Sequence, residues 1–368
     1  MQLRRVIISG GGTGGHIFPA LAIADGLKEK YPGVEIKFVG ALGKMEMERV
    51  PKAGYDIVGL DIQGLKRSFS LDNLKFPIKV MNSIAKSRKL LNEFQPQLAI
   101  GVGGYASGPL LFAATRKKIK TLIQEQNSYA GITNKILGKS VDKICIAYPE
   151  AKKYFPAQKV VLTGNPVRQN IHSNLSQAEA KSKLGFSVDK PTLLVIGGSL
   201  GALKINQCLF AQVQKFCEQG YQVYWQCGKR FFENRSDELK SLEQKVNGLS
   251  IAAFIDDMAT AYKAADLVVS RAGALAIAEI QALGKASILV PSPFVAENHQ
   301  FKNAMTLVNK QAAKLVDEHQ VEEELLKQAK ALLQNPDELK RLEKNVAETA
   351  ISSAVDKIIS CIETLLNE

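Results

Sequence analysis

Short apolar, β-branched runs alternate with amphipathic stretches along most of this 368-residue chain, and this alternation restricts its possible folds. The runs are nearly continuous in apolar residues, as is typical of parallel strands covered by helices on both faces. They form two series, separated near Gly164-Asn165-Pro166 by a polar segment. We therefore expect two doubly wound α/β domains. The expected strands are Arg5–Ser9, Glu35–Val39, Leu98–Val102, Lys120–Gln124, Lys143–Ala147 and Val160–Thr163, then Thr192–Ile196, Gln222–Gln226, Ser250–Ala253, Leu267–Ser270 and Ser287–Val290.

Three glycine-rich segments each follow an expected strand and precede an expected helix: Gly10–His16, Gly101–Gly108 and Gly197–Ala202. Glycine lets a backbone approach a ligand closely, and a helix N-terminus presents N–H groups with a partial positive charge. The segments predict anion binding, typically of phosphate, at the carboxyl edges of both sheets.

Several common phosphate-binding and metal-binding patterns do not fit. Gly10, Gly12 and Gly15 match the dinucleotide fingerprint, but the second strand ends at Gly40 without the acid that would hold a ribose. The sequence contains no GxxxxGK[ST] and no DxD, and its four histidines show no metal-ligand spacing. Asp256 and Asp257 are adjacent, so their side chains should diverge. We therefore expect no metal or other cofactor, with helix dipoles, backbone amides and a cation stabilising any diphosphate leaving group.

Charge is distributed unevenly. Residues 1–166 hold 25 Lys and Arg against 12 Asp and Glu, whereas the remainder holds 23 against 24. A basic first half predicts an anionic partner, which can be a nucleic acid, an acidic membrane surface or a phosphorylated substrate. The alternative is a basic solvent-exposed face that has no partner.

The chain shows no membrane-spanning or secretory pattern. No run of eighteen apolar residues occurs, and the N-terminus leads directly into an expected strand. The five cysteines are odd in number and lack CxxC spacing, which favours reduced thiols in the cytoplasm.

Seven motifs together resemble the MurG family, the bacterial transferases that add N-acetylglucosamine (GlcNAc) to a polyprenyl-linked cell-wall precursor. The resemblance implies the GT-B fold, with two Rossmann-like doubly wound parallel-sheet domains facing a central cleft. It places the acceptor and membrane side in residues 1–164 with a C-terminal helix from about 345 to 368, and the donor domain in residues 165–344. The motifs are GGGTGGHIFPA (10–20), GGYASGP (103–109), EQNSYAGITN (125–134), GNPVR (164–168), GGSLGA (197–202), FIDDM (254–258) and SRAGALAIAE (270–279).

The implied reaction is an inverting transfer of GlcNAc from UDP-GlcNAc to the MurNAc 4-hydroxyl of undecaprenyl-diphospho-MurNAc-pentapeptide, which converts lipid I into lipid II in peptidoglycan synthesis. A UDP-GlcNAc 2-epimerase of the same fold is the alternative within this class. A nucleic-acid-binding protein would use the basic half, but no RNA-binding or helix-turn-helix signature occurs, so we expect no nucleic acid partner.

The resemblance implies a donor site in the second domain. Glu279 would hold both ribose hydroxyls, since one carboxylate can accept from two O–H donors. The alternative for Glu279 is an exposed helical acid. Ile255 would bind uracil through its backbone, and Gln300 would contact sugar hydroxyls. The remaining implied donor-binding residues are Arg168 and Ser199 at the diphosphate, and Ala274, Leu275, Ala276, Ile277 and Ala278 along the pocket.

In the first domain, His16 is the candidate general base. A helix N-terminus disfavours imidazolium, so the ring should be neutral and able to accept a proton. The alternative is a histidine that only orients the loop. Residues implied to meet the transferred sugar and the acceptor are Thr13, Gly14, Gly15 and Asn127, with Gly103, Gly104 and Tyr105 at the acceptor diphosphate.

Residues 74–89 mix large apolar side chains with lysine and arginine, a pattern that fits docking at an anionic bilayer surface. We expect a peripheral protein on the cytoplasmic face of the bacterial inner membrane. The alternative is a buried helix with a lysine-rich outer face. The expected membrane contacts are Phe76, Ile78, Met81 and Ile84.

Overall fold

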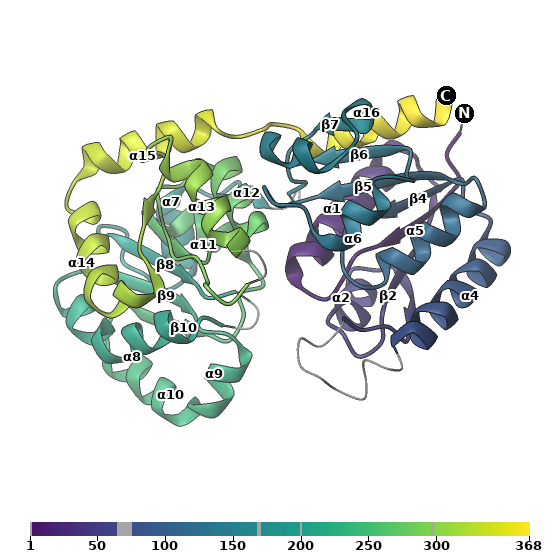
Figure 1. The fold of residues 1–368 in the computed structure, drawn as a ribbon. Coiled ribbons are helices and arrows are strands. Elements are labelled where there is room, and N and C mark those ends of the chain that lie inside the picture. The colour runs from purple at the N-terminus through teal and green to yellow at the C-terminus, as the bar shows by residue number, and fades with distance from the viewer. Residues whose placement is uncertain (1, 65–75, 168–170, 199–200, 296–297) are drawn as a thin grey trace. The chain divides into compact units, whose positions relative to one another are not determined.

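The computed structural model describes residues 2–64, 76–167, 171–198, 201–295 and 298–368. The chain divides into two compact units, which we call unit 1 (Met1–Arg168 with Ile351–Glu368) and unit 2 (Gln169–Ala350). Each unit contains its own parallel sheet (Figure 1). The sequence-based boundaries were residue 164 and about residue 345, so both lie within a few residues of this division.

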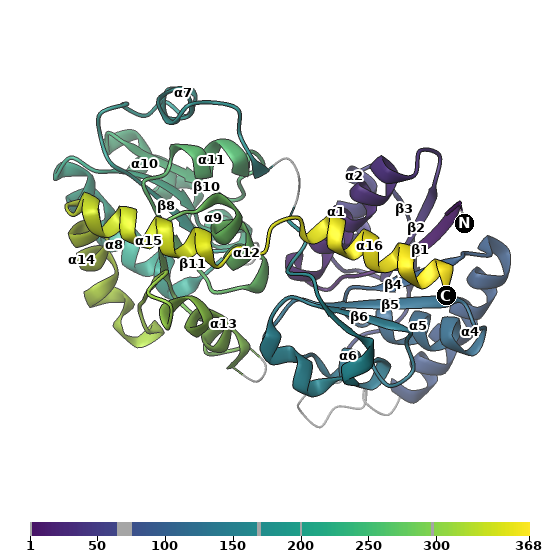
Figure 2. The ribbon, with the colours of Figure 1, turned by 90° about the horizontal axis from the view of Figure 1, so that it is seen from above.

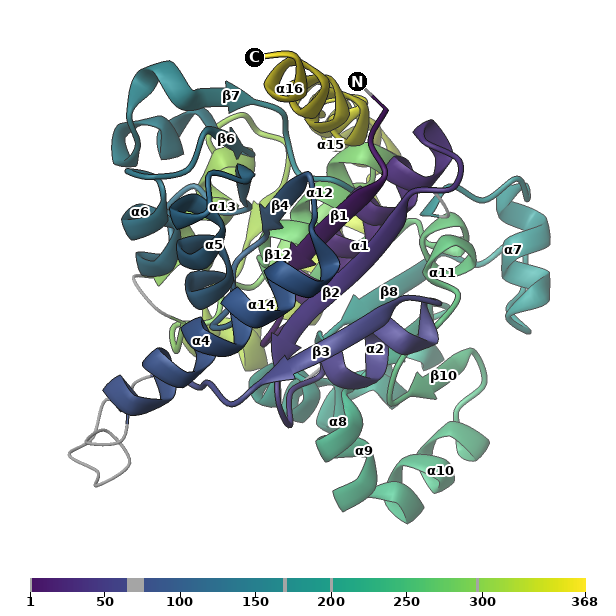
Figure 3. The same cartoon turned by 90° about the vertical axis from the view of Figure 1, so that its right-hand side faces the viewer.

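The sheet of unit 1 has seven strands in the described part of the chain, in the order β3-β2-β1-β4-β5-β6-β7. Figure 3 shows β3, β2, β1 and β4 side by side. Every pairing is parallel, which confirms the prediction of a doubly wound sheet. The strands are β1 (Arg5–Ser9), β2 (Glu35–Ala41), β3 (Asp56–Leu60), β4 (Leu98–Gly101), β5 (Lys120–Glu125), β6 (Lys143–Ile146) and β7 (Val160–Leu162).

Successive residues of β1 supply two different cores, because side chains alternate across a strand. Val6 and Ile8 belong to a cluster with helices α1 and α16, whereas Ile7 belongs to a cluster with α4 and α5. Both faces of the sheet are therefore covered. The helices of unit 1 are α1 (Gly14–Lys30), α2 (Glu46–Lys52), α4 (Phe76–Phe94), α5 (Ser107–Arg116), α6 (Ile132–Leu137) and α16 (Ala354–Asn367), with 3-10 helices at Pro149–Tyr154 and Ala157–Lys159.

Helix α16 packs against α1, although more than 300 residues separate them in sequence (Figure 2). A Cβ at Gly26 of α1 would lie 2.3 Å from Val355 of α16, so glycine is what permits this close approach. The Tyr31 hydroxyl donates a 2.9 Å hydrogen bond to Glu363. Ile358 and Ile362 are fully buried here.

The described sheet of unit 2 has six parallel strands in the order β10-β9-β8-β11-β12-β13. Its strands are β8 (Thr192–Ile196), β9 (Gln222–Gln226), β10 (Leu249–Ala252), β11 (Leu267–Ser270), β12 (Ser287–Leu289) and β13 (Lys314–Leu315). Its helices are α7 (Gln177–Lys183), α8 (Leu203–Glu218), α9 (Lys229–Asn234), α10 (Ser236–Lys245), α11 (Met258–Ala264), α12 (Ala274–Leu283), α13 (His299–Val308), α14 (Val321–Leu333) and α15 (Pro336–Glu348), with a 3-10 helix at Glu318–Gln320.

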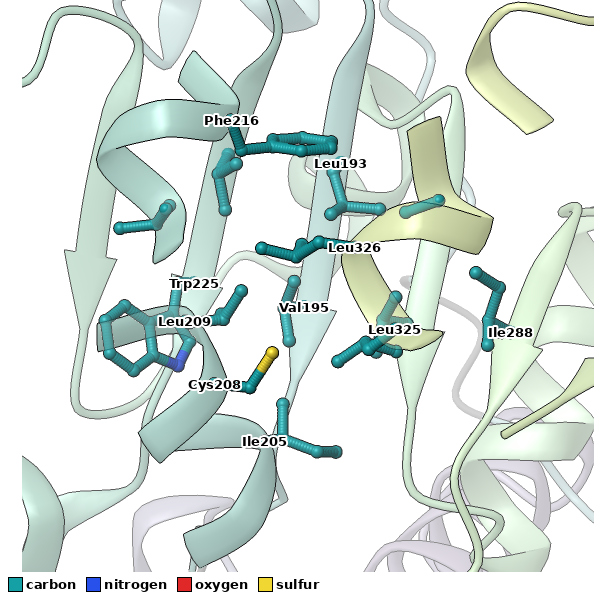
Figure 4. Packing of buried hydrophobic residues seen from close by; sticks show 14 of the residues in the cluster. Leu193, Val195, Ile205, Cys208, Leu209, Phe216, Trp225, Ile288, Leu325 and Leu326 are labelled. Carbon is teal, nitrogen blue, oxygen red and sulfur yellow. The ribbon is translucent and has the colours of Figure 1, made fainter. Parts of the chain in front are cut away.

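Leu193 and Val195 of β8 pack between residues of α8 and α14 in the core of unit 2 (Figure 4). Trp225 of β9 is fully buried in the same cluster. Its indole N–H donates a 3.1 Å hydrogen bond to Asn206, so the one polar atom of this large side chain is satisfied.

Both sheets reverse their strand order at one point. In unit 1 the reversal lies between β1 and β4, and in unit 2 between β8 and β11. At such a point the connections leave the strand ends in opposite directions, and ligands bind at the carboxyl ends there. The first two glycine-rich segments follow β1 and β4, and the third follows β8.

The structure corrects three expectations. Strands β3 and β13 were missed because β3 is an edge strand interrupted by Gly59 and β13 has only two residues. The C-terminal helix expected from about residue 345 begins only at Ala354, since α15 ends at Glu348 and Ser353 adopts a positive φ of 56° before α16.

The sequence also predicted reduced cysteine thiols and no membrane-spanning helix. All five cysteines are free and buried. In the residues described, no helix has the length and apolar character needed to cross a bilayer.

Candidate active site

The loop after β1 leads from Ser9 through Gly10–Thr13 into α1. Thr13 is the N-cap residue with extended backbone, and its carbonyl accepts from the His16 N–H at 3.1 Å. Gly12 has φ of 86°, a conformation that side chains disfavour. The predicted residues Thr13, Gly14 and Gly15 thus form the exposed or half-buried first turn of α1.

The loop after β4 packs directly on this first loop. The Gly11 N–H donates to the Gly103 carbonyl at 3.3 Å, and Ser107 Oγ donates to the carbonyls of Ser9 and Gly103, each at 2.9 Å. A Cβ at Gly104 would lie only 2.4 Å from the Gly11 carbonyl oxygen. Glycine at position 104 is therefore needed for the two loops to touch.

His16 lies where these loops meet. Its Nδ1 is 2.9 Å from Oε1 of Gln126, and the ring is half-buried. A Cβ at Gly103 would lie 2.7 Å from the ring, so this glycine makes room for the imidazole. Tyr105, predicted at the acceptor diphosphate, is 46% exposed at the same edge of the sheet.

Asn127 lies just beyond the end of β5, beside a buried carboxylate. Glu125 Oε1 accepts from the Asn127 backbone N–H at 3.0 Å and from its Nδ2 at 3.2 Å. Glu125 Oε2 accepts from the Gly131 N–H at 3.0 Å and from Asn134 Nδ2 at 2.9 Å. Glu125 therefore fixes the loop that carries Asn127.

Sequence reasoning gave no role to Glu46, Glu125 or Gln126. Glu46 is 1% exposed and accepts from the Gly12 N–H, 34 residues away. Glu125 and Gln126 could have been found from their position, since they follow the carboxyl end of an expected strand and precede Asn127.

In unit 2, Glu279 lies on the second turn of α12 and is 6% exposed, so the alternative of an exposed helical acid is wrong. The hydroxyl of the buried Tyr262 donates to Glu279 Oε2 at 3.1 Å. Ala274, Ile277 and Ala278 are buried, and Leu275 and Ala276 are half-buried.

The loop after β8 contains Gly198 and Gly201, both with positive φ. A Cβ at Gly201 would lie 2.5 Å from the Cys227 carbonyl oxygen, so this loop also approaches its neighbour closely. The long helix α8 begins just after it. Two predicted diphosphate ligands, Ser199 and Arg168, lie outside the described residues.

Two further predicted donor residues follow the ends of other strands. Ile255 is 2% exposed in the connection after β10. Gln300 lies in the first turn of α13, where its Oε1 accepts from the Ser292 N–H at 2.8 Å. The carboxamide oxygen of Gln300 therefore already accepts one hydrogen bond from the loop that precedes α13.

Asp257, two residues after Ile255, has a structural role. It caps α11 by accepting from the Thr260 N–H at 3.0 Å. A hydrogen bond from Lys183, then the bonds from Thr260, lower the pKa of Asp257 to about 2. In the described residues, no group of three His, Cys, Asp or Glu side chains is placed to hold a metal ion.

The four predicted membrane contacts lie on α4 and differ in exposure. Ile78 and Met81 are 63% and 68% exposed, whereas Phe76 and Ile84 are half-buried. Ile78 and Met81 are thus the apolar side chains that α4 presents to solvent.

Two parallel α/β domains with glycine-rich loops at their switch points are the arrangement found in the GT-B class of nucleotide-sugar enzymes. Residues 6–146 match the glycosyltransferase family 28 N-terminal domain, and residues 192–358 match the family 28 C-terminal domain. The chain belongs to glycosyltransferase family 28, in its MurG group.

Individual relatives agree with this assignment. A UDP-N-acetylglucosamine–N-acetylmuramyl-(pentapeptide) pyrophosphoryl-undecaprenol N-acetylglucosamine transferase of Cytophaga hutchinsonii is 49% identical over 99% of this chain and 97% of its own length. The crystal structure of Acinetobacter baumannii MurG matches with a TM-score of 0.74 and 29% identity, over 98% of this chain and 99% of that one.

A putative UDP-N-acetylglucosamine 2-epimerase from Listeria monocytogenes also matches, with a TM-score of 0.69 over 99% of this chain and 97% of that one. Its sequence identity is 15%. This likeness shows a shared fold alone.

Proposed function

We propose that the chain transfers GlcNAc from UDP-GlcNAc to the MurNAc 4-hydroxyl of undecaprenyl-diphospho-MurNAc-pentapeptide, and so makes lipid II for peptidoglycan synthesis. The observation that carries this proposal is the 49% identity, over nearly the full length of both chains, to a transferase named for this reaction. The placement of His16 at the carboxyl edge of unit 1 is consistent with it.

In this reaction the acceptor oxygen attacks the anomeric carbon of the donor sugar. The O–H proton passes to His16 as a new C–O bond forms, and the bond from the anomeric carbon to the diphosphate breaks, with its electron pair leaving on UDP. Attack from the face opposite the leaving group inverts the configuration. A positioned base of this kind contributes about 10²–10⁴-fold.

Unit 2 would hold the donor. Glu279 would accept from the ribose hydroxyls, and Ile255 would meet uracil through its backbone. The N-terminal end of α8, with Ser199 and Arg168, would stabilise the departing diphosphate, because helix amides and a cation favour negative charge. No step requires a metal ion.

Unit 1 would hold the acceptor, with Gly103, Gly104 and Tyr105 at its diphosphate and Thr13, Gly14, Gly15 and Asn127 at the sugars. We also propose that the protein works as a peripheral enzyme on the cytoplasmic face of the bacterial inner membrane. The basic excess of residues 1–166 and the exposed Ile78 and Met81 on α4 support this location.

A turnover assay with radiolabelled UDP-GlcNAc tests the reaction. With a lipid I analogue present, label should move to the lipid, and His16→Ala should lower kcat by about 10²–10⁴-fold while donor affinity is kept. With donor alone, no C2-epimerised donor should form. Epimerisation without acceptor, or no labelled lipid from the wild-type protein, would refute the proposal.

A further inference from the structure

His16 and Gln126 form a side-chain pair whose donor and acceptor can be assigned from their surroundings. A neutral imidazole carries its proton on one nitrogen only, and the partner of the other nitrogen decides which. His16 Nδ1 lies 2.9 Å from Gln126 Oε1. When the Gln126 atom that faces Nδ1 is the oxygen, Nδ1 must carry the proton and donate it to that oxygen.

The opposite end of the Gln126 carboxamide is surrounded by oxygen atoms. Its Nε2 donates to the Val102 carbonyl at 2.8 Å and to the Gln124 carbonyl at 3.0 Å. A third acceptor is Oε1 of Gln124. The two backbone carbonyls can only accept, so the nitrogen must point toward them and the oxygen toward His16.

The orientation of Gln124 is fixed in the same way. Its Nε2 donates to Asn165 Oδ1 at 3.1 Å, and Asn165 Nδ2 donates to the Gln126 carbonyl at 2.9 Å. The side chains that carry these three amides are all buried: Gln124 is 0% exposed, Gln126 is 1% exposed and Asn165 is 9% exposed. Reversing any one of them would leave a buried donor facing a donor or an oxygen facing an oxygen, which is costly in an interior.

We infer that Gln126 is a positioning residue that holds His16 in the Nδ1–H tautomer, so that Nε2 is the atom that accepts the acceptor's proton. This inference rests on the proposed base role of His16 for its catalytic part. Free histidine side chains in water favour the opposite tautomer, so the amide network selects the form with Nε2 unprotonated. A carboxylate in place of Gln126 would also orient the ring, and it would in addition stabilise the imidazolium that forms on proton transfer, whereas the neutral carboxamide of Gln126 supplies the orientation alone.

The tautomer can be observed directly by NMR with [15N]-imidazole-labelled protein, at a pH where histidine is neutral. The His16 signals are those that disappear in His16→Ala. In the wild-type protein, Nδ1 should show the protonated shift and Nε2 the unprotonated one. In Gln126→Met, which keeps the side-chain length but removes the acceptor, the Nε2–H form should become the major one. Gln158→Met, on an exposed glutamine of unit 1, is the matched control and should leave the His16 signals unchanged.

The wild-type spectrum decides the inference even if the buried Gln126 cannot be replaced without unfolding. An Nε2–H tautomer for His16 in the wild-type protein would overturn it. So would an Nδ1–H tautomer that persists undiminished in a folded Gln126→Met variant.

Kinetics test whether Gln126 acts through His16. Gln126→Met should lower kcat by about 10- to 100-fold, by analogy with the partners that orient metal-bound histidines, with KM for UDP-GlcNAc unchanged. In a His16→Ala background, Gln126→Met should have no further effect on kcat. Additive losses would show a structural role and overturn the inference. If His16→Ala alone leaves kcat intact, the base assignment in the proposed function fails, whereas the NMR result still decides the tautomer.

Discussion

The carboxylate of Glu46 accepts a 2.8 Å hydrogen bond from the backbone N–H of Gly12, in the loop that precedes α1. Its other oxygen accepts from the N–H of Ala41 at the end of β2, at 3.0 Å. Glu46 thus places its carboxylate where a phosphate bound by the loop amides would otherwise lie. This arrangement disfavours a dinucleotide at the first loop. It also ties that loop, which leads into the turn of α1 carrying His16, to the sheet.

Glu46→Gln should loosen this loop, because the new NH2 group would face a backbone N–H. We expect a loss of about 1–3 kcal/mol in the free energy of unfolding, the cost of an unpaired buried group. We also expect a lower kcat with unchanged affinity for UDP-GlcNAc. Urea unfolding and calorimetry are the measurements. Glu48→Gln, two residues along α2, is the control, and equal effects of both changes would contradict the role of Glu46.

Glu279→Gln should weaken UDP-GlcNAc binding by about 1–3 kcal/mol, because two ribose hydroxyls lose a charged acceptor. The amide oxygen can still accept from Tyr262, so the fold around α12 should survive. Isothermal calorimetry measures the affinity, with Glu322→Gln, an exposed acid of unit 2, as the control. A folded Glu279→Gln variant that binds the donor as tightly as wild type would remove this residue from the donor site.

Transfer should continue at full rate after dialysis against EDTA, because helix amides and a cation are proposed to replace a divalent ion. The same assay with added manganese or magnesium should give no increase. Loss of activity with chelator, restored by either ion, would show that the leaving group needs a metal.

Ile78→Ser combined with Met81→Ser should reduce binding to anionic vesicles by at least about tenfold, because each buried apolar side chain contributes about 1.5–3 kcal/mol. Vesicle co-sedimentation measures this, and high salt should weaken wild-type binding as well. Val188→Ser replaces an exposed apolar residue of unit 2 and should have no effect. The surface on α4 is not the docking site if the double variant sediments like wild type, or if neutral vesicles bind equally well.

Asp257 should make the stability of unit 2 depend on pH in acid. Its pKa, lowered to about 2 by Lys183 and Thr260, lies below its unfolded value, so its contribution is complete above about pH 4 and is lost as the pH falls toward 2. Asp257→Asn keeps the cap but removes the charge. We expect the free energy of unfolding to fall by up to about 1 kcal/mol near pH 6, a small value because both partners are half exposed, and the difference from wild type to be mostly lost near pH 2.

Trp225, the single tryptophan of the chain, lies buried in unit 2, so its fluorescence reports unfolding of this unit. Urea titrations at several pH values are therefore the measurement. A stability difference between Asp257→Asn and wild type that does not shrink with falling pH would contradict the charge pair.

The sequence predicted the parts of the fold that depend on local pattern. Strands such as Arg5–Ser9 and Thr192–Ile196 are continuous apolar runs, and the glycine-rich segments mark the turns that follow them. The pairings around His16 could not be predicted in this way, since Gln126 is 110 residues away in sequence. The role of Glu46 was hidden for the same reason, because a buried acid on a short helix has no local signature until the loop that it holds is placed.

Helix α16 has a consequence for the order in which the protein is made. Ile358, Ile362 and Leu365 complete the same apolar cluster as α1, yet the ribosome synthesises them after the whole of unit 2. At roughly 5–20 residues per second, the nascent first unit waits about 10–40 seconds with that face uncovered. During this interval it offers an apolar surface to chaperones and to other nascent chains. The core of the first unit is therefore closed only after the second unit has been synthesised.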